Sequence, residues 1–148
     1  MILTVHLLTG AALASKIQPL SLALVLSFLS HYFLDLLPHP EEYSIKNIKE
    51  KKWRKSLPDF LKIGLDISVG LLIISVLTDR QPAIYSAALL AGLPDFFTFL
   101  SLVFPPFLSW HEKLHEKIHF AKELKIPFFW RFFIQAAVFA TALSFLVF

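Results

Sequence analysis

The sequence predicts an all-α integral membrane protein, a helical bundle of four to five transmembrane helices with an amphipathic helix on its cytoplasmic side. Apolar residues make up 56% of the 148 positions and charged residues only 17%, an unusual balance for a soluble domain. Five apolar stretches run along the chain, separated by polar segments, and the basic residues gather in two of those segments. The length fits one domain, 1–148.

The first apolar stretch, about 2–15, is short for a membrane span, and we expect a short or half-inserted helix there. A helix needs roughly 20 residues to cross the hydrocarbon, or fewer where the bilayer thins. The other four stretches satisfy this: 20–37, 60–77, 83–104 and 128–148. The sequence therefore predicts four spans and one shorter helix.

Lysine and arginine predict the orientation of the helices. Twelve of the 14 basic residues lie in the segments 38–58 and 105–127 or just beyond them. The positive-inside rule makes this side cytoplasmic, which places the N-terminus inside a multi-pass inner-membrane protein. Basic loops beside a membrane also attract anionic headgroups. We therefore expect membrane lipids as partners, and we expect the net charge of +3 to serve lipid contact and not nucleic-acid binding.

All six histidines and four of the five aspartates fall at the cytoplasmic end of this topology. They are His6, His31, His39, His111, His115, His119, Asp35, Asp59, Asp66 and Asp95. Ionisable groups inside a membrane protein are costly and usually functional. The chain has no cysteine, so a metal must be bound by imidazole and carboxylate. Such ligands suit a divalent metal, zinc first, with manganese or iron as alternatives.

His31 and Asp35 are four residues apart and share one helical face, so they can bind one ion or hydrogen-bond each other at the helix end. His6 alone is typical of a satisfied buried histidine, but Gly10 one turn later lets another helix approach closely. Asp95 follows a proline that loosens its helix, and a metal or a paired base explains a carboxylate at that depth.

The segment HEKLHEKIH, residues 111–119, contains the zincin signature HExxH twice. In that interpretation His111 and His115 bind zinc and Glu112 activates water. The chain offers no strand-rich half to bind a peptide, and the segment also fits an amphipathic helix at the membrane surface. We favour an amphipathic helix whose histidine stripe faces the bundle and contributes one or two ligands.

The sequence also contains a faint internal repeat, about 2–40 and 60–120. The dipeptide Gln-Pro opens a helix at 18–19 and again at 81–82, and the two helices end in the acidic motifs SHYFLD and GLPDFF. Two helical hairpins related in this way would bring their cytoplasmic ends together. Chance in a leucine-rich sequence is the alternative.

Three segments, VHLLTGAAL, SHYFLDLLPH and LLAGLPDFF, resemble the small bacterial membrane-bound metal-dependent hydrolases, distant relatives of zinc-dependent phospholipase C and similar all-helical enzymes. The family has an early His before a Gly, an LPD acid, an HxxxD helix and a His pair in a polar connector. These elements match His6 with Gly10, Asp95, His31 with Asp35, and His111 with His115. Here the HxxxD element precedes the LPD element, and the connector reads HEKLHEKIH.

The resemblance implies hydrolysis, with a phosphoester on a lipid or another amphiphilic small molecule as the expected substrate. We expect His6, His31, Asp35, Asp95 and a connector histidine, His111 or His115, to bind one or two ions. Asp66 or Glu112 would accept a proton, and His39, Lys52 and Arg54 would bind the substrate. The alternatives are an intramembrane zinc protease that uses HEKLH, and a non-enzymatic membrane protein that binds metal or lipid or serves as a scaffold.

Overall fold

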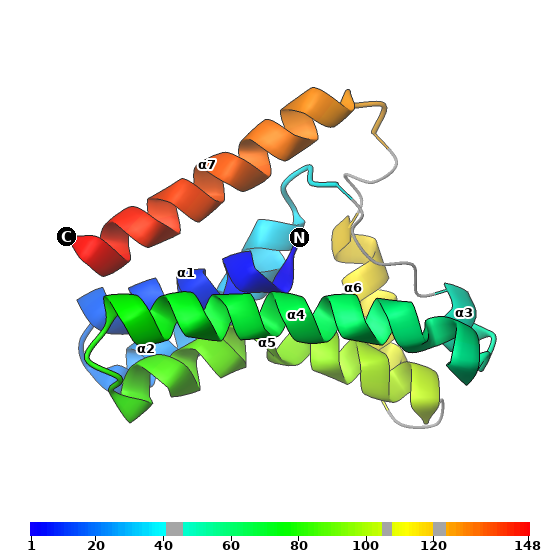
Figure 1. The fold of residues 1–148 in the computed structure, drawn as a ribbon, viewed down its shortest axis with the longest axis horizontal. Helices are drawn as coiled ribbons and strands as arrows, with labels where there is room; N and C mark the ends of the chain where they lie inside the picture. Colours follow the sequence, from blue (N-terminus) through cyan, green and yellow to red (C-terminus); the bar gives the residue numbers. More distant parts are fainter. Residues whose placement is uncertain (41–45, 105–107, 120–123) are drawn as a thin grey trace.

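A computed structural model describes residues 1–40, 46–104, 108–119 and 124–148. Within these ranges every regular element is a helix, so the predicted all-α class is confirmed (Figure 1). In order, the elements are α1 (Leu3–Lys16), α2 (Leu20–Asp35), α3 (Lys46–Lys49), α4 (Trp53–Leu77), α5 (Pro82–Val103), α6 (Ser109–Ile118) and α7 (Phe128–Val147).

Three helices, α4, α5 and α7, are long and apolar enough to cross a membrane. The apolar helix α2 is shorter, with 16 residues, and α1 has only 14. The helix expected at 60–77 begins earlier, at Trp53, and continues through Pro58. A proline removes one amide hydrogen bond, which a long helix packed on its neighbours can tolerate. Three spans therefore follow from length and composition among the described residues, and the larger count stays a prediction.

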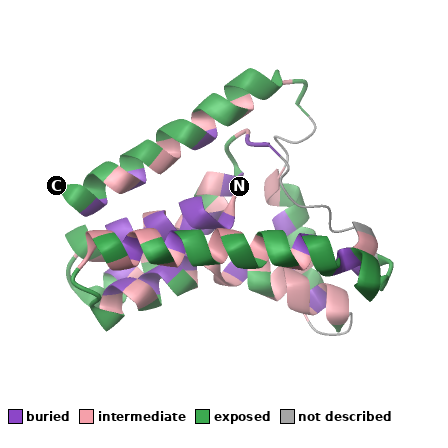
Figure 2. Cartoon of the chain, in the orientation of Figure 1, coloured by how far each residue is buried: buried purple, intermediate pink, exposed green. Residues whose placement is uncertain are grey.

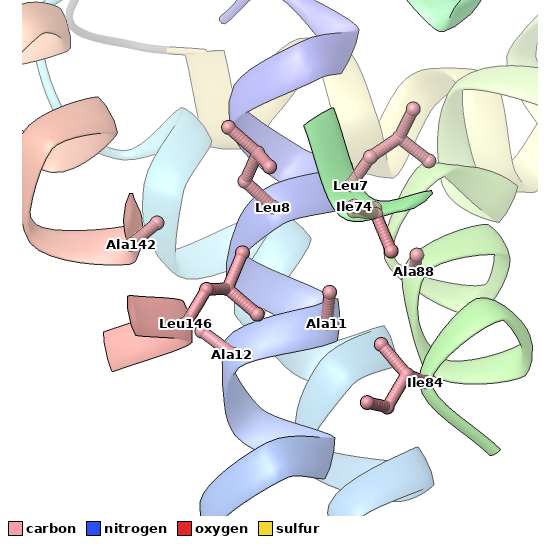
Figure 3. Close-up of a cluster of buried hydrophobic side chains, with 9 residues drawn as sticks. All are labelled: Leu7, Leu8, Ala11, Ala12, Ile74, Ile84, Ala88, Ala142 and Leu146. Atoms are coloured by element: carbon pink, nitrogen blue, oxygen red, sulfur yellow. The ribbon is translucent and has the colours of Figure 1, made fainter. Parts of the chain in front are cut away.

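The short first helix lies at the centre of the bundle. Helix α1 contacts α2, α4, α5 and α7, and nine of its 14 residues are buried (Figure 2). Its side chains meet those of α4, α5 and α7 in one apolar cluster (Figure 3). The cluster comprises Leu7, Leu8, Ala11, Ala12, Ile74, Ile84, Ala88, Ala142 and Leu146. Burial by protein on all sides explains why α1 is apolar although it is short.

Gly10 lets α1 and α5 approach closely, as the sequence predicts. A Cβ atom added at Gly10 would lie 2.5 Å from the carbonyl oxygen of Ala87 and 2.8 Å from the Cβ of Ala91. Those distances are too short for any side chain without movement of α5. The contact therefore holds the part of α5 that carries Asp95 against the first helix.

The start of α1 is held by a carboxylate from α4. The two oxygens of Asp66 accept hydrogen bonds from the amides of Leu3 and Thr4, at 2.6 and 3.2 Å, and from the Thr4 hydroxyl. These amides belong to the first turn, where a helix offers no carbonyl partner. In Figure 1 the N-terminus consequently lies about midway along α4, with α3 and α6 toward one end of the bundle.

Candidate metal centre

The cluster of histidines and aspartates surrounds one carboxylate, that of Asp35 at the end of α2. Its side chain is 1% exposed. Nε2 of His31 and Nε2 of His115 each lie 3.0 Å from Oδ2 of Asp35, and these two nitrogens are 3.1 Å apart. Nε2 of His119 lies 3.2 Å from the same oxygen. The expected pairing of His31 with Asp35 along one helix is therefore confirmed, and the end of α6 joins it.

A second set of groups surrounds the other oxygen of Asp35. Nε2 of His6 lies 3.3 Å from Oδ1 and Nε2 of His39 lies 3.6 Å from it. The amine of Met1 donates to Oδ1 at 3.0 Å and is 3.1 Å from Nε2 of His39. His6 is fully buried and stacks on His31 with ring centroids 4.1 Å apart. Within the described ranges, neither ring nitrogen of His6 has a hydrogen-bond partner.

Asp95 completes a four-ligand group with His31, Asp35 and His115. Its Oδ1 lies 3.6 Å from Nε2 of His31 and 3.8 Å from Nε2 of His115. All four ligand atoms lie within 4.8 Å of one another. A tetrahedral zinc ion with bonds of about 2.0–2.1 Å places its ligands about 3.3 Å apart. Five of the six separations are 3.0–3.8 Å and the sixth, between Asp35 and Asp95, is within 4.8 Å, so the group suits one such ion after adjustment.

Backbone carbonyls determine which nitrogen of two histidines carries a proton. Nδ1 of His31 is 2.8 Å from the carbonyl oxygen of Ala91, and Nδ1 of His39 is 3.0 Å from that of Pro40. A carbonyl only accepts, so each Nδ1 must donate its hydrogen. In the neutral ring the lone pair then lies on Nε2, the atom that faces Asp35. Metal-binding histidines are commonly oriented in this way.

A hydroxyl group orients the ring of His115 in a similar way, through its Nδ1. Oγ1 of Thr98 is 2.9 Å from Nδ1 of His115 and 3.2 Å from the carbonyl oxygen of Pro94. With the hydroxyl hydrogen on the Pro94 carbonyl, the hydroxyl oxygen accepts from Nδ1 of His115. The Nε2 lone pair of His115 is then directed at Asp35 as well.

This arrangement could hold a cation among the side chains. His31 and His115 direct Nε2 lone pairs at Asp35, and a lone pair facing a carboxylate oxygen is repulsive, whereas Nε2 of His39 accepts from the Met1 amine. Protonating Nε2 of both His31 and His115 would put two positive rings side by side, with those atoms 3.1 Å apart. A divalent ion bound by these nitrogens and by the carboxylates of Asp35 and Asp95 removes both conflicts. The residues present therefore fit a metal of the predicted kind.

Two histidines outside the candidate spans are kept neutral. Burial, and then the positive charge of the Met1 amine, lower the pKa of His39 to about 4. Burial, and then the neighbouring His115, lower the pKa of His111. At neutral pH these rings carry no charge, the form in which an imidazole nitrogen can bind a metal.

His111 lies one turn before His115 on α6 but belongs to neither metal-binding group. It is buried, and its Nε2 is 3.0 Å from the hydroxyl of Tyr32. Glu112 accepts a hydrogen bond from the Ser101 hydroxyl at 3.3 Å. A zincin site needs both histidines of HEKLH on one ion. The geometry therefore supports His115 alone of that pair, and the roles of His111 and Glu112 stay predictions.

The remaining predicted residues lie elsewhere. The carboxylate of Asp66 caps α1, which occupies both of its oxygens. Lys52 and Arg54, at the start of α4, are exposed, and Lys52 pairs with Glu50. A catalytic role for Asp66 and substrate binding by the two basic residues stay predictions.

His39, predicted to bind substrate, and His119, a member of the histidine stripe not singled out as a ligand, both contact Asp35. They form a second possible metal-binding group with it. The sequence does contain a pattern that could have identified these two histidines. His31, Asp35 and His39 follow one another at four-residue steps, as do His111, His115 and His119. Thr98 and the carbonyl of Ala91 have no such signal, because only packing brings them to the histidine rings.

Replacing Thr98 with valine is expected to weaken metal binding about 10- to 100-fold, the usual effect of removing a partner that orients a ligand. Valine keeps the shape but cannot accept from Nδ1 of His115. Affinity would be measured by zinc competition against a chromophoric chelator. Thr141→Val is the matched control, since that hydroxyl donates to the Ala137 carbonyl on the exposed face of α7. Equal affinities in the two variants would contradict this role of Thr98.

Comparison of the chain with models of protein families, with curated proteins and with solved structures yields no match. The resemblance to bacterial membrane-bound hydrolases therefore stays an expectation. What the protein does must be argued from the geometry around Asp35.

Proposed function

We propose that the protein is a membrane-bound, metal-dependent hydrolase that cleaves a phosphoester of a lipid or similar amphiphile at the cytoplasmic face of the inner membrane. One observation carries the proposal: His31, His39 and His115 each bind an oxygen through Nδ1 and direct Nε2 at Asp35. Metal-binding histidines are commonly oriented in this way, with one ring nitrogen held by an oxygen and the other free for the ion.

Four side chains would hold the ion: His31, Asp35, Asp95 and His115. Zinc suits this set best, with manganese or iron as alternatives. When bound, such an ion lowers the pKa of water towards ~7 and polarises a phosphoryl oxygen. Of the two carboxylates expected to accept a proton, Asp66 already receives three hydrogen bonds from α1. We therefore assign proton transfer to Glu112, which lies on the same helix as His115.

The substrate would reach the site beside Asp95. Its side chain is 33% exposed, whereas those of His31, Asp35 and His115 are at most 6% exposed. Asp95 lies on α5, a helix apolar enough to cross a membrane, and its neighbour Phe96 is exposed. A substrate with an apolar tail could thus approach from the lipid. Lys52 and Arg54, on the basic side of the chain, would attract its phosphate.

The test is hydrolysis by purified protein loaded with zinc. The probes are bis(p-nitrophenyl) phosphate and a short-chain phosphatidic acid, with release of nitrophenol and of phosphate as readouts. We expect turnover that needs metal and falls at least about 100-fold in Asp95→Asn, a loss typical when one electrostatic stabiliser is removed. Asp79→Asn is the control, since Asp79 is exposed at the far turn between α4 and α5.

Metal-loaded protein that cleaves neither probe would contradict the proposal. So would equal rates in the Asp95→Asn and Asp79→Asn variants. If a casein or peptide substrate were cleaved instead, and Glu112→Gln abolished that cleavage, the protease alternative would replace it.

A further inference from the structure

The two oxygens of Asp35 face different sets of nitrogens. Oδ2 is closest to His31, His115 and His119, and Oδ1 is closest to His6 and His39, so a carboxylate at this position can contact an ion on either side. We propose that the centre binds two divalent ions and that Asp35 bridges them, the second ion being held by Asp35, His39 and His119. The proposal rests on the metal-dependent function above and assigns ligand roles to two histidines outside the first group.

The second group has the composition and closeness of a metal site. One ligand atom each from Asp35, His39 and His119 lie within 4.8 Å of one another. Asp35 and His39 are buried, and the His119 side chain is 11% exposed. The Pro40 carbonyl holds Nδ1 of His39, so the free Nε2 is the atom directed at Asp35. The ligands come from the end of α2, the chain just beyond it, and the end of α6.

Two further observations concern the Oδ1 side, where a positive group is already bound and a buried histidine lacks a hydrogen bond. The Met1 amine, a positive group, lies 3.0 Å from Oδ1 and 3.1 Å from Nε2 of His39. It thus occupies the position that an ion between Asp35 and His39 would take. His6 is fully buried on the same side, and among the described residues neither of its ring nitrogens has a hydrogen-bond partner, although Nε2 lies 3.3 Å from Oδ1 of Asp35. A buried polar atom without a partner is costly.

Two ions bridged by one carboxylate would narrow the substrate class. In two-metal enzymes a pair of ions stabilises both the attacking and the leaving oxygen of an in-line displacement, which is the chemistry of phosphoester cleavage. A protease of the HExxH type uses a single ion. A bridged pair would therefore favour a phosphoester over a peptide as the substrate.

The first experiment measures metal per chain in purified protein by mass spectrometry after zinc loading. Wild type is expected to hold two ions. His39→Ala and His119→Ala are each expected to hold one. Asp79→Asn is the control, an exposed carboxylate between α4 and α5 that lies outside both groups, and should keep two. Size-exclusion profiles and helical circular dichroism would confirm that each variant is folded.

The second experiment needs no variant. Ions that share a bridge lie about 3.5–4 Å apart in two-metal enzymes, close enough for magnetic coupling. Wild-type protein loaded with manganese should therefore give the multiline electron paramagnetic resonance spectrum of a coupled pair, and not the six-line spectrum of an isolated ion.

Each outcome bears on the proposal. One ion in wild type with a six-line spectrum overturns the second site and leaves the proposed function standing, because the Met1 amine then keeps that position. No bound ion overturns both. A folded His39→Ala or His119→Ala protein that holds two ions, or none, overturns the assignment of these histidines.

Discussion

Replacing Asp35 with asparagine is expected to abolish metal binding and hydrolysis. The carboxylate contacts five histidines, and asparagine keeps its size but removes its charge and one of its two acceptor oxygens. The loss of affinity should exceed the about 10- to 100-fold typical when only a partner of a ligand is removed. Metal content by mass spectrometry and turnover of bis(p-nitrophenyl) phosphate would measure both effects.

Asp79→Asn is the matched control for this change, since it removes the same charge from an exposed aspartate. It should leave metal content and activity unchanged. Folding of the Asp35→Asn protein would be checked by helical circular dichroism. A folded variant that binds metal as wild type does would show that Asp35 is a structural acid and not a ligand.

Chelation is expected to destabilise the wild-type protein strongly. The proposed ligands come from α2, α5 and α6, so the folded chain binds the ion and the unfolded chain does not. Such an ion contributes about 2.7 kcal/mol at a free concentration of 100 Kd and about 4.1 kcal/mol at 1,000 Kd. For a chain of this length the loss corresponds to a Tm lower by about 10 °C. Fluorescence of the three tryptophans during heating in detergent would report it.

The Asp35→Asn protein is the control for the chelation experiment. It should unfold at the same temperature with and without chelator, because it has no ion to lose. An equal shift in both proteins would mean that the chelator acts on the detergent or the fold and not on a metal. No shift in metal-loaded wild type would contradict a centre that ties the helices together.

Local patterns predicted part of the candidate site. His31 and Asp35 share a helical face because they are four residues apart, and the structure brings them together with Asp95. The glycine at position 10 predicted a close helix contact, and α5 makes it. These features depend on spacing within one helix or on the size of one residue. They can be recognised without knowing which helices are neighbours.

Such local patterns could not predict the roles of the individual histidines of α6. The four-residue spacing puts His111, His115 and His119 on one stripe, and nothing in the sequence says which of them reaches Asp35. Packing of α6 on α5 and α2 turns His115 and His119 to the carboxylate and His111 to the hydroxyl of Tyr32. The HEKLH motif matches a known signature, but its two histidines consequently do not both contact Asp35.

By itself the sequence determined a helical, apolar chain, and its hydrophobic runs and basic segments predicted that the histidines and most aspartates collect at one end. Only the tertiary structure decided that Asp35 is the centre. Helical periodicity chooses a face but not the neighbour of that face. The neighbours depend on contacts between distant residues, such as Gly10 against Ala87 and Asp66 against the start of α1. Those contacts place five histidines around one carboxylate.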